Sequence, residues 1–168
     1  MSDVIAVCVA GATGWTGRAV AEAVLGDADL DLRSAVARSA AGGDLGTAWG
    51  LQPNGVPVVA DIGDALDGVE VLVDYTSHDV AKRHTLTAVA HGVHVVIGSS
   101  GLTAADFAEI DAAARAAGVG VVAAGNFSLT AAMAQAAAPA RPGDRRLRLG
   151  RQAGRSERHC PRAGRATR

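Results

Sequence analysis

The sequence contains few aromatic residues and few cysteines. Aromatic residues make up 3% of the 168 residues, and the hydrophobic 49% is mostly Ala, Val and Leu. This composition favours a compact α/β core of small side chains. The two cysteines are Cys8, within an apolar run, and Cys160, near the end of the chain. Two cysteines placed in this way indicate neither a disulfide framework nor a metal site.

A long hydrophobic run is also missing. No stretch approaches the roughly 20 apolar residues that cross a bilayer as a helix, and the N-terminus has no basic segment like that of a secretion signal. We therefore expect a cytoplasmic protein without a membrane partner. The length suits one domain, or one domain with an appendage.

A glycine-rich turn follows the first apolar run. Residues 4–9 are too few for a buried helix and are rich in β-branched residues, so we expect a buried strand. The turn GATGWTG follows at 11–17, and an Ala/Val/Leu helix is expected from about Thr16. Strand, glycine turn and helix in this order aim free backbone N–H groups and a helix N-terminus at a phosphate.

The three glycines of this turn have separate expected roles. Gly11 allows a sharp turn off the strand, Gly14 allows the backbone to approach a pyrophosphate, and Gly17 allows the helix to pack closely on the sheet. The spacing is G-x-x-G-x-x-G, because Thr13 occupies the place of the middle glycine in the commoner fingerprint. We predict nucleotide binding here, with a merely structural turn as the alternative.

Strands and helices alternate as far as residue 123. Expected strands are 30–37, 57–60, 69–75, 93–97 and 119–123; expected helices are a short one ending near Gly68, 78–91 and 103–117; residues 40–55 are interpreted as a loop. The alternation predicts an α/β fold with a doubly wound, Rossmann-like parallel sheet. Ligands of such sheets bind at the carboxyl ends of the strands. The segments expected at those ends are 11–17, Arg38, 75–76, 98–101 and 125–128.

The end of the second expected strand bears on cofactor choice. In a dinucleotide fold an acidic residue there binds the ribose 2′-hydroxyl, whereas an arginine suits a 2′-phosphate. Here Ala37 precedes Arg38, which favours NADPH. A solvated surface arginine is the alternative.

Other residues with chemical potential give weaker signals. His91 and His94 flank a glycine with no further ligand nearby, so we interpret them as surface histidines. His78 and His84 are expected on different faces of one helix and receive no role. Asp74 ends a strand and could be catalytic, although a carboxylate beside a turn is more often a cap.

The net charge of −1 conceals a basic C-terminal region. Residues 141–168 hold ten arginines and two acidic residues, whereas residues 1–140 hold six basic and fifteen acidic residues. Because few apolar residues follow residue 141, we expect a disordered tail. A nucleic-acid-binding arm is the alternative. The tail lacks interleaved aromatics and a known motif, so we expect no nucleic-acid partner.

Four motifs together resemble one enzyme family. They are GATGWTGR at 11–18, DYTSHD at 74–79, VVIGSSGLT at 95–103 and AAGNFSLTAAM at 123–133. In order and spacing they resemble 4-hydroxy-tetrahydrodipicolinate reductase (dihydrodipicolinate reductase), whose counterparts are G-A-x-G-R-M-G, D-F-T, G-T-T-G and N-F-S. The resemblance implies reduction of a cyclic dicarboxylate by NADPH or NADH in the diaminopimelate pathway to lysine.

The resemblance also implies cofactor-binding roles for individual residues. Those implied to hold the pyrophosphate are Gly11, Ala12, Thr13, Gly14, Trp15 and Thr16, with Arg38 at the 2′-phosphate. Those implied to line the nicotinamide side are Gly98, Ser99 and Ser100; those implied to lie between cofactor and substrate are Ala124, Gly125, Asn126 and Phe127. The chain departs from the family's usual residues at Trp15 and Thr16, at Ala37, and at the serines that replace paired threonines. The first two departures bear on cofactor choice.

The resemblance covers residues 1 to about 138, which we expect to form the dinucleotide-binding domain. In the family a second domain follows, with the catalytic groups, a P-S-G-T-A substrate loop and a homotetramer interface. Residues 148–168 can be encoded by synonymous codons whose DNA, read one base later, translates to a peptide containing K-P-D-A-P-S-G-T-A. This peptide includes the lysine and the P-S-G-T-A loop of the family. We therefore expect 139–168 to be a frameshift-derived tail, with the catalytic residues in the missing domain. A non-catalytic NAD(P)H-binding module or redox sensor is the alternative.

Overall fold

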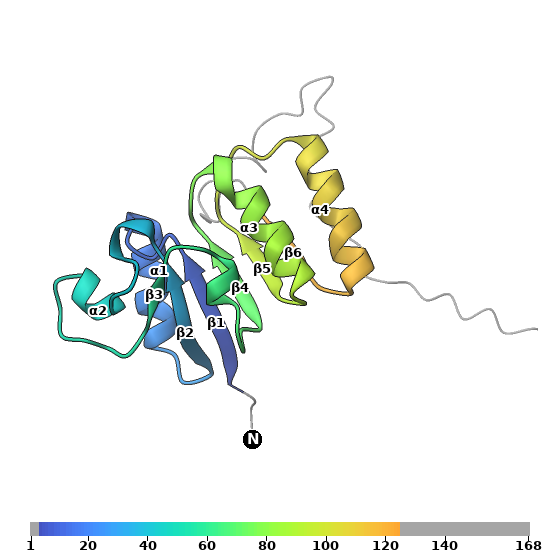
Figure 1. Ribbon diagram of the computed structural model, residues 1–168. Helices are drawn as coiled ribbons and strands as arrows, with labels where there is room; N and C mark the ends of the chain where they lie inside the picture. Colours follow the sequence, from blue (N-terminus) through green and yellow to red (C-terminus); the bar gives the residue numbers. More distant parts are fainter. Residues whose placement is uncertain (1–3, 125–168) are drawn as a thin grey trace, which may run out of the picture.

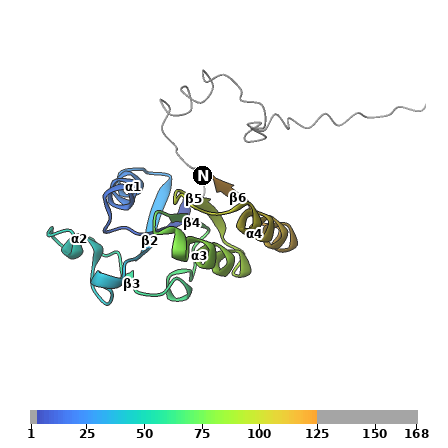
Figure 2. The same ribbon diagram turned by 90° about the horizontal axis from the view of Figure 1, so that it is seen from above.

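The computed structural model describes residues 4–124, which form one six-stranded sheet with helices on both faces (Figure 1). The strands are β1 (Ile5–Ala10), β2 (Leu30–Val36), β3 (Val58–Val59), β4 (Val71–Asp74), β5 (His94–Ile97) and β6 (Val121–Ala123). The helices are α1 (Trp15–Leu25), α2 (Leu45–Ala48), α3 (His78–Ala90) and α4 (Ala104–Ala117), with 3-10 turns η1 (Arg38–Ala40) and η2 (Gly63–Ala65). Figure 2 shows α1 on one face of the sheet and α3 and α4 on the other.

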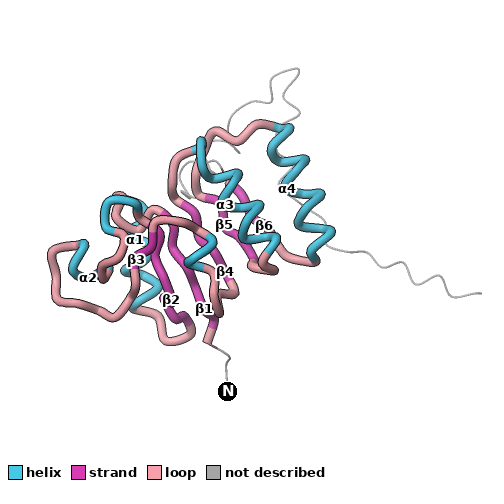
Figure 3. Tube along the Cα trace, in the orientation of Figure 1, coloured by secondary structure: helices cyan, strands magenta, loops and turns pink. Residues whose placement is uncertain are grey.

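The strand order is β3-β2-β1-β4-β5-β6, and all neighbouring strands run parallel. The chain moves outward from β1 to β3 and then returns to place β4 on the other side of β1 (Figure 3). This reversal opens a crevice at the carboxyl ends of β1 and β4, where ligands of doubly wound sheets bind. The predicted fold class is confirmed.

Two apolar clusters fill the two faces of the sheet. The cluster under α3 and α4 includes Leu72, Ala88, Val95, Ile97 and Ile110. The cluster under α1 includes Val7, Val9, Ala21, Val24 and Val58. Every residue of β1 after the first is buried, as expected for a central strand that is covered on both faces.

Most predicted elements are present with small shifts, and α4 has the clearest ends. The Thr103 hydroxyl accepts a hydrogen bond from the Asp106 N–H at 3.2 Å, and the Asp106 carboxylate accepts one from the Thr103 N–H at 2.8 Å. Gly118, with φ of 70°, ends the helix in the left-handed conformation. Among residues 4–124, no helix combines the length and apolar character needed to cross a membrane.

Two sequence interpretations between β2 and β4 need correction. The predicted loop at 40–55 contains α2, a single turn that Asp44 caps by accepting a hydrogen bond from the Thr47 N–H at 3.1 Å. The short helix expected before Gly68 is only the 3-10 turn η2. Elements of one turn are too short to produce the helical periodicity on which such predictions depend.

Candidate functional site

The glycine loop lies at the carboxyl end of β1, as predicted. Gly11 has φ of 84°, and a Cβ there would lie 2.6 Å from the Tyr75 carbonyl oxygen. A Cβ on buried Gly17 would collide with the Gly11 carbonyl oxygen. Gly14 is exposed, and its N–H donates to the Gly11 carbonyl at 2.9 Å. Packing therefore requires glycine at positions 11 and 17, whereas a Cβ on exposed Gly14 would lie 3.2 Å from the Gly11 carbonyl oxygen.

The first turn of α1 is suited to an anion. Gly14 is its N-cap and provides no side chain to satisfy the backbone donors, and the first turn contains no acidic residue. Residues 13–16 are all exposed. The N–H groups and positive end of the helix dipole are therefore available to a phosphate. These features fit a dinucleotide pyrophosphate.

A tryptophan far along the chain supports the same loop. The Trp49 Nε1–H donates to the Ala12 carbonyl at 3.0 Å. The Arg18 guanidinium carbon lies 5.1 Å from the centroid of the Trp49 ring, a cation–π distance. Trp49 belongs to none of the sequence motifs, so its contact with the glycine loop was not predicted. By contrast, Trp15 is 99% exposed at the start of α1.

The β2 side of the crevice contains a hollow of about 350 Å³. Its lining residues are Thr13, Ser39, Ala40, Gly43, Asp44, Thr47 and Ala48. Arg38 is exposed directly beside this lining, at the first position of η1, while Ala37 is buried. Backbone N–H groups of Thr47, Asn54 and Gly55 all donate to the Asp44 carboxylate.

Tyr75 connects the loops that follow β1, β4 and β5. A Cβ on Gly98 would collide with the Tyr75 ring, so this ring lies directly against the Gly98 backbone. The Tyr75 N–H donates to the Ala10 carbonyl at 2.9 Å, and the Gly98 N–H donates to the Asp74 carbonyl at 2.8 Å. These contacts bring segments 11–17, 75–76 and 98–101 together at the switch point.

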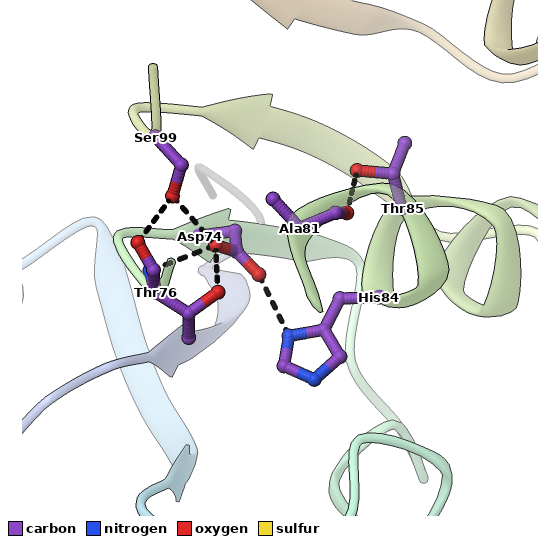
Figure 4. A network of polar contacts seen from close by, with 6 residues as sticks. All are labelled: Asp74, Thr76, Ala81, His84, Thr85 and Ser99. Carbon is purple, nitrogen blue, oxygen red and sulfur yellow. Dashed lines mark hydrogen bonds and ion pairs between the residues drawn. The ribbon is translucent and has the colours of Figure 1, made fainter. Parts of the chain in front are cut away.

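A buried carboxylate joins two of these loops (Figure 4). Asp74 Oδ1 accepts hydrogen bonds from the Thr76 N–H at 2.9 Å and from the Thr76 hydroxyl at 2.7 Å. Asp74 Oδ2 lies 2.8 Å from His84 Nδ1. The Ser99 hydroxyl lies 3.1 Å from Asp74 Oδ1 and 2.8 Å from the Thr76 carbonyl oxygen. Since a hydroxyl has one proton, Ser99 shares it between these two acceptors.

The electrostatics of this network keep Asp74 ionised. Burial raises the pKa of the Asp74 carboxyl, but hydrogen bonds from His84 and Thr76 outweigh burial, so that pKa lies below its ordinary value. Asp74 is fully buried and His84 is 5% exposed. Burial also raises the pKa of the Cys8 thiol to about 11, which leaves it protonated. Asp74 is thus an acceptor in a cap-like turn and lies beneath the crevice surface.

The structure gives His84 a contact that sequence analysis missed. His78 is exposed and His84 is buried, so the prediction of different helix faces is confirmed. The sequence did not predict the contact of the His84 ring with Asp74. The helical spacing of buried Ala81, His84 and Ala88 could have placed this histidine on the inner face.

The remaining predicted residues lie in different places. His91 and His94 are exposed, and each uses Nδ1 in a hydrogen bond with the backbone, at Thr87 and Gly120 respectively. The Ala124 N–H lies 3.4 Å from the Ile97 carbonyl oxygen, at the end of β5. The predicted residues Gly125, Asn126 and Phe127, and the whole predicted tail, lie outside the described residues.

Comparison with known proteins places this arrangement in a family. The model of the family described as "Dihydrodipicolinate reductase, N-terminus" matches residues 5–127. The chain belongs to this family. The resemblance found in the sequence motifs is therefore confirmed, whereas the roles assigned to individual residues stay predictions.

Two curated relatives show how much of the family is represented. The 4-hydroxy-tetrahydrodipicolinate reductase of Anaeromyxobacter dehalogenans (strain 2CP-C) is 41% identical over 112 residues, which cover 65% of this chain and 42% of the relative. The enzyme of the same name from Parasynechococcus marenigrum (strain WH8102) is 37% identical over 152 residues, covering 83% of this chain and 55% of the relative. The chain thus spans about half the length of the curated relatives it matches.

Solved structures share the fold. GenD2 from gentamicin A biosynthesis, in complex with NAD, has a TM-score of 0.62 and 29% identity, with 76% of this chain and 36% of that chain covered. Dipicolinate-bound dihydrodipicolinate reductase from Paenisporosarcina sp. TG-14 has a TM-score of 0.66 and 23% identity, with coverage of 77% and 50%. The second likeness shows the fold alone.

Proposed function

We propose that this chain provides the NAD(P)H-binding domain of a 4-hydroxy-tetrahydrodipicolinate reductase. The observation that carries the proposal is the convergence of three loops, 11–17, 75–76 and 98–101, at the switch point. The pyrophosphate would lie at the start of α1, and the adenosine would lie beside the hollow after β2. The nicotinamide would then lie over the loops after β4 and β5.

The reaction proposed for the whole protein follows from the family. It is reduction of 4-hydroxy-tetrahydrodipicolinate to tetrahydrodipicolinate in diaminopimelate and lysine biosynthesis, with NADPH or NADH supplying the hydride. The described residues would hold the dinucleotide and orient its nicotinamide ring. The names of the curated relatives support this reaction. A cytoplasmic location, a cyclic dicarboxylate substrate and a homotetramer belong to the same proposal.

We also propose that the 168-residue chain binds cofactor without turning over substrate. Asp74 and His84 are buried against each other, so neither is placed to give a proton to a bound substrate. General acid–base assistance typically contributes 10²–10⁴-fold to a rate. The chain should oxidise no NADPH above background when substrate is supplied. Full activity of the 168-residue chain would contradict this proposal.

Titration with NADPH, followed by nicotinamide fluorescence, tests the binding site. The parent chain should bind, and Gly14→Val should abolish binding because a branched side chain would occupy the place of the pyrophosphate. Position 14 has φ of −80°, which valine adopts, but a Cβ there would lie 3.2 Å from the Gly11 carbonyl oxygen, so circular dichroism should show that the variant has the parent's fold before binding is compared. Gly26→Val, at the other end of α1, is the matched control and should bind normally. Equal binding by the parent and Gly14→Val would show that this loop does not bind the pyrophosphate.

A further inference from the structure

The Asp74–His84 pair connects elements that meet on the proposed nicotinamide side. Asp74 is the last residue of β4, Ser99 lies just after β5, and His84 belongs to α3. Figure 4 shows the Thr76, Ser99 and His84 side chains pointing toward the one carboxylate. Both members of the pair are buried.

We propose that Asp74, anchored by His84, is a positioning residue that fixes the loops after β4 and β5 against each other beneath the nicotinamide. This inference rests on the proposed function. Two donors of Thr76 reach Asp74 Oδ1, and the Ser99 hydroxyl shares its proton between that oxygen and the Thr76 carbonyl. The Gly98 N–H bond to the Asp74 carbonyl joins the two loops at their base, and the carboxylate extends this connection to Thr76 and Ser99 beyond the strand ends.

A charge is well suited to this task, although its burial is costly. Removing a carboxylate from water costs several kcal/mol, which only good hydrogen bonds offset. Hydrogen bonds to an ionised acceptor are shorter and roughly twice as strong as neutral ones. His84 satisfies Oδ2 at 2.8 Å, which leaves Oδ1 directed at the two loops. His84 thus fixes the orientation of the carboxylate and, through it, the loops.

The effect should be confined to one half of the dinucleotide. The hollow on the adenosine side is lined by residue 13 and by residues from 39–48, and the hydrogen bonds of Asp74 and His84 go to other residues. The glycine loop meets β4 mainly through the backbone of Tyr75. Loss of the Asp74 hydrogen bonds should therefore weaken binding of the nicotinamide half and leave binding of the adenosine half unchanged.

The test compares NADPH with 2′-phospho-ADP-ribose, which has the adenosine half and the pyrophosphate but lacks nicotinamide. His84→Phe keeps a ring but removes the donor to Asp74, and it should raise the Kd for NADPH roughly tenfold. The Kd for the fragment should change less than about twofold, and bound NADPH should lose part of its nicotinamide fluorescence enhancement. His84→Asn keeps a donor near the Nδ1 position and should restore most of the NADPH affinity.

Two further variants separate the effect of the Asp74 hydrogen bonds from general damage to α3. Thr85→Val removes another buried polar group from α3, whose hydroxyl donates to the Ala81 carbonyl within the same helix, and should bind both ligands as the parent does. Asp74→Asn keeps the shape of the side chain, and it should reproduce the selective loss even if His84→Phe folds poorly.

The possible failures are distinguishable. Equal weakening of NADPH and the fragment in both variants would show a merely structural role and overturn the inference, as would unchanged NADPH binding. A parent chain that binds neither ligand would overturn the proposed function itself.

Discussion

The two halves of the crevice are built differently. On the β2 side, Thr13 in the glycine loop and Arg38 in η1 are exposed side chains on separate segments of backbone. On the β4–β5 side, Thr76 and Ser99 are joined through one buried carboxylate. Contacting residues are energetically coupled, whereas separate residues act independently. A change at Arg38 should therefore affect its own contact alone, whereas a change at Asp74 should affect Thr76, His84 and Ser99 together.

The largest loss of stability is expected when the carboxylate that joins Thr76, Ser99 and His84 is removed. Asp74→Ala removes the acceptor of His84, Thr76 and Ser99 and should lower the free energy of unfolding by about 3–5 kcal/mol. Urea denaturation followed by circular dichroism measures this loss. Asp111→Ala is the matched control, because Asp111 pairs with Arg115 on the exposed surface of α4 and should change stability little. Similar losses in the two variants would argue against the buried network.

A slightly smaller effect is expected at the glycine loop, which lies between the two halves. Gly17→Ala places a Cβ against the Gly11 carbonyl oxygen, and backbone must move to admit it. The variant should lose about 3 kcal/mol of unfolding free energy in the same urea experiment. Gly26→Ala provides the comparison at the end of the same helix, where a Cβ would meet its nearest neighbour at 3.5 Å. A stable Gly17→Ala protein would mean that α1 packs less closely than the structure indicates.

The adenosine side should show an effect on cofactor choice without an effect on folding. Arg38→Ala should weaken NADPH binding about ten- to a hundredfold, equivalent to roughly 1.5–3 kcal/mol for one charge-assisted contact. NADH binding should stay nearly unchanged, because NADH has no 2′-phosphate. Arg33→Ala, on β2 and paired with Asp31, should alter neither Kd. If Arg38→Ala weakens both cofactors equally, Arg38 does not recognise the 2′-phosphate.

The two tryptophans should contribute differently to stability, by smaller amounts than the residues above. Trp49→Phe removes the donor to the Ala12 carbonyl and should cost about 1 kcal/mol of unfolding free energy. Trp15→Phe changes a side chain that is 99% exposed, so the same measurement should detect no loss. A larger loss for Trp15→Phe than for Trp49→Phe would reverse the roles assigned to these residues.

The smallest expected effect is a difference in acid sensitivity. The pKa of Asp74 is lower in the folded protein than its ordinary value of about 4, so the unfolded chain binds this proton more tightly. The resulting stability is fully present above about pH 4 and is lost as the pH falls below it. Asp74→Asn should therefore show a shallower decline of unfolding free energy between neutral and acidic pH than the parent. An unchanged slope would mean that Asp74 does not titrate differently on folding.

The fold class and the position of the glycine loop could be predicted from local features of the sequence. The apolar run of β1, the glycines that follow it and the capping residues of α4 act within a few neighbouring positions. Such signals are local, and the strand–helix alternation they produce permits few topologies. The family motifs are local in the same sense. This is why the crevice could be anticipated before the sheet was seen.

Only the tertiary structure decided how the crevice is supported. Trp49 reaches Ala12 across 37 positions, and Ser99 reaches Asp74 across 25. Neither contact leaves a periodic trace in the sequence, because each depends on the order and register of strands that assemble from distant segments. The Asp74–His84 hydrogen bond likewise depends on how α3 packs over β4. Local chemistry selects the elements, but the distances between their side chains are fixed only when the elements pack.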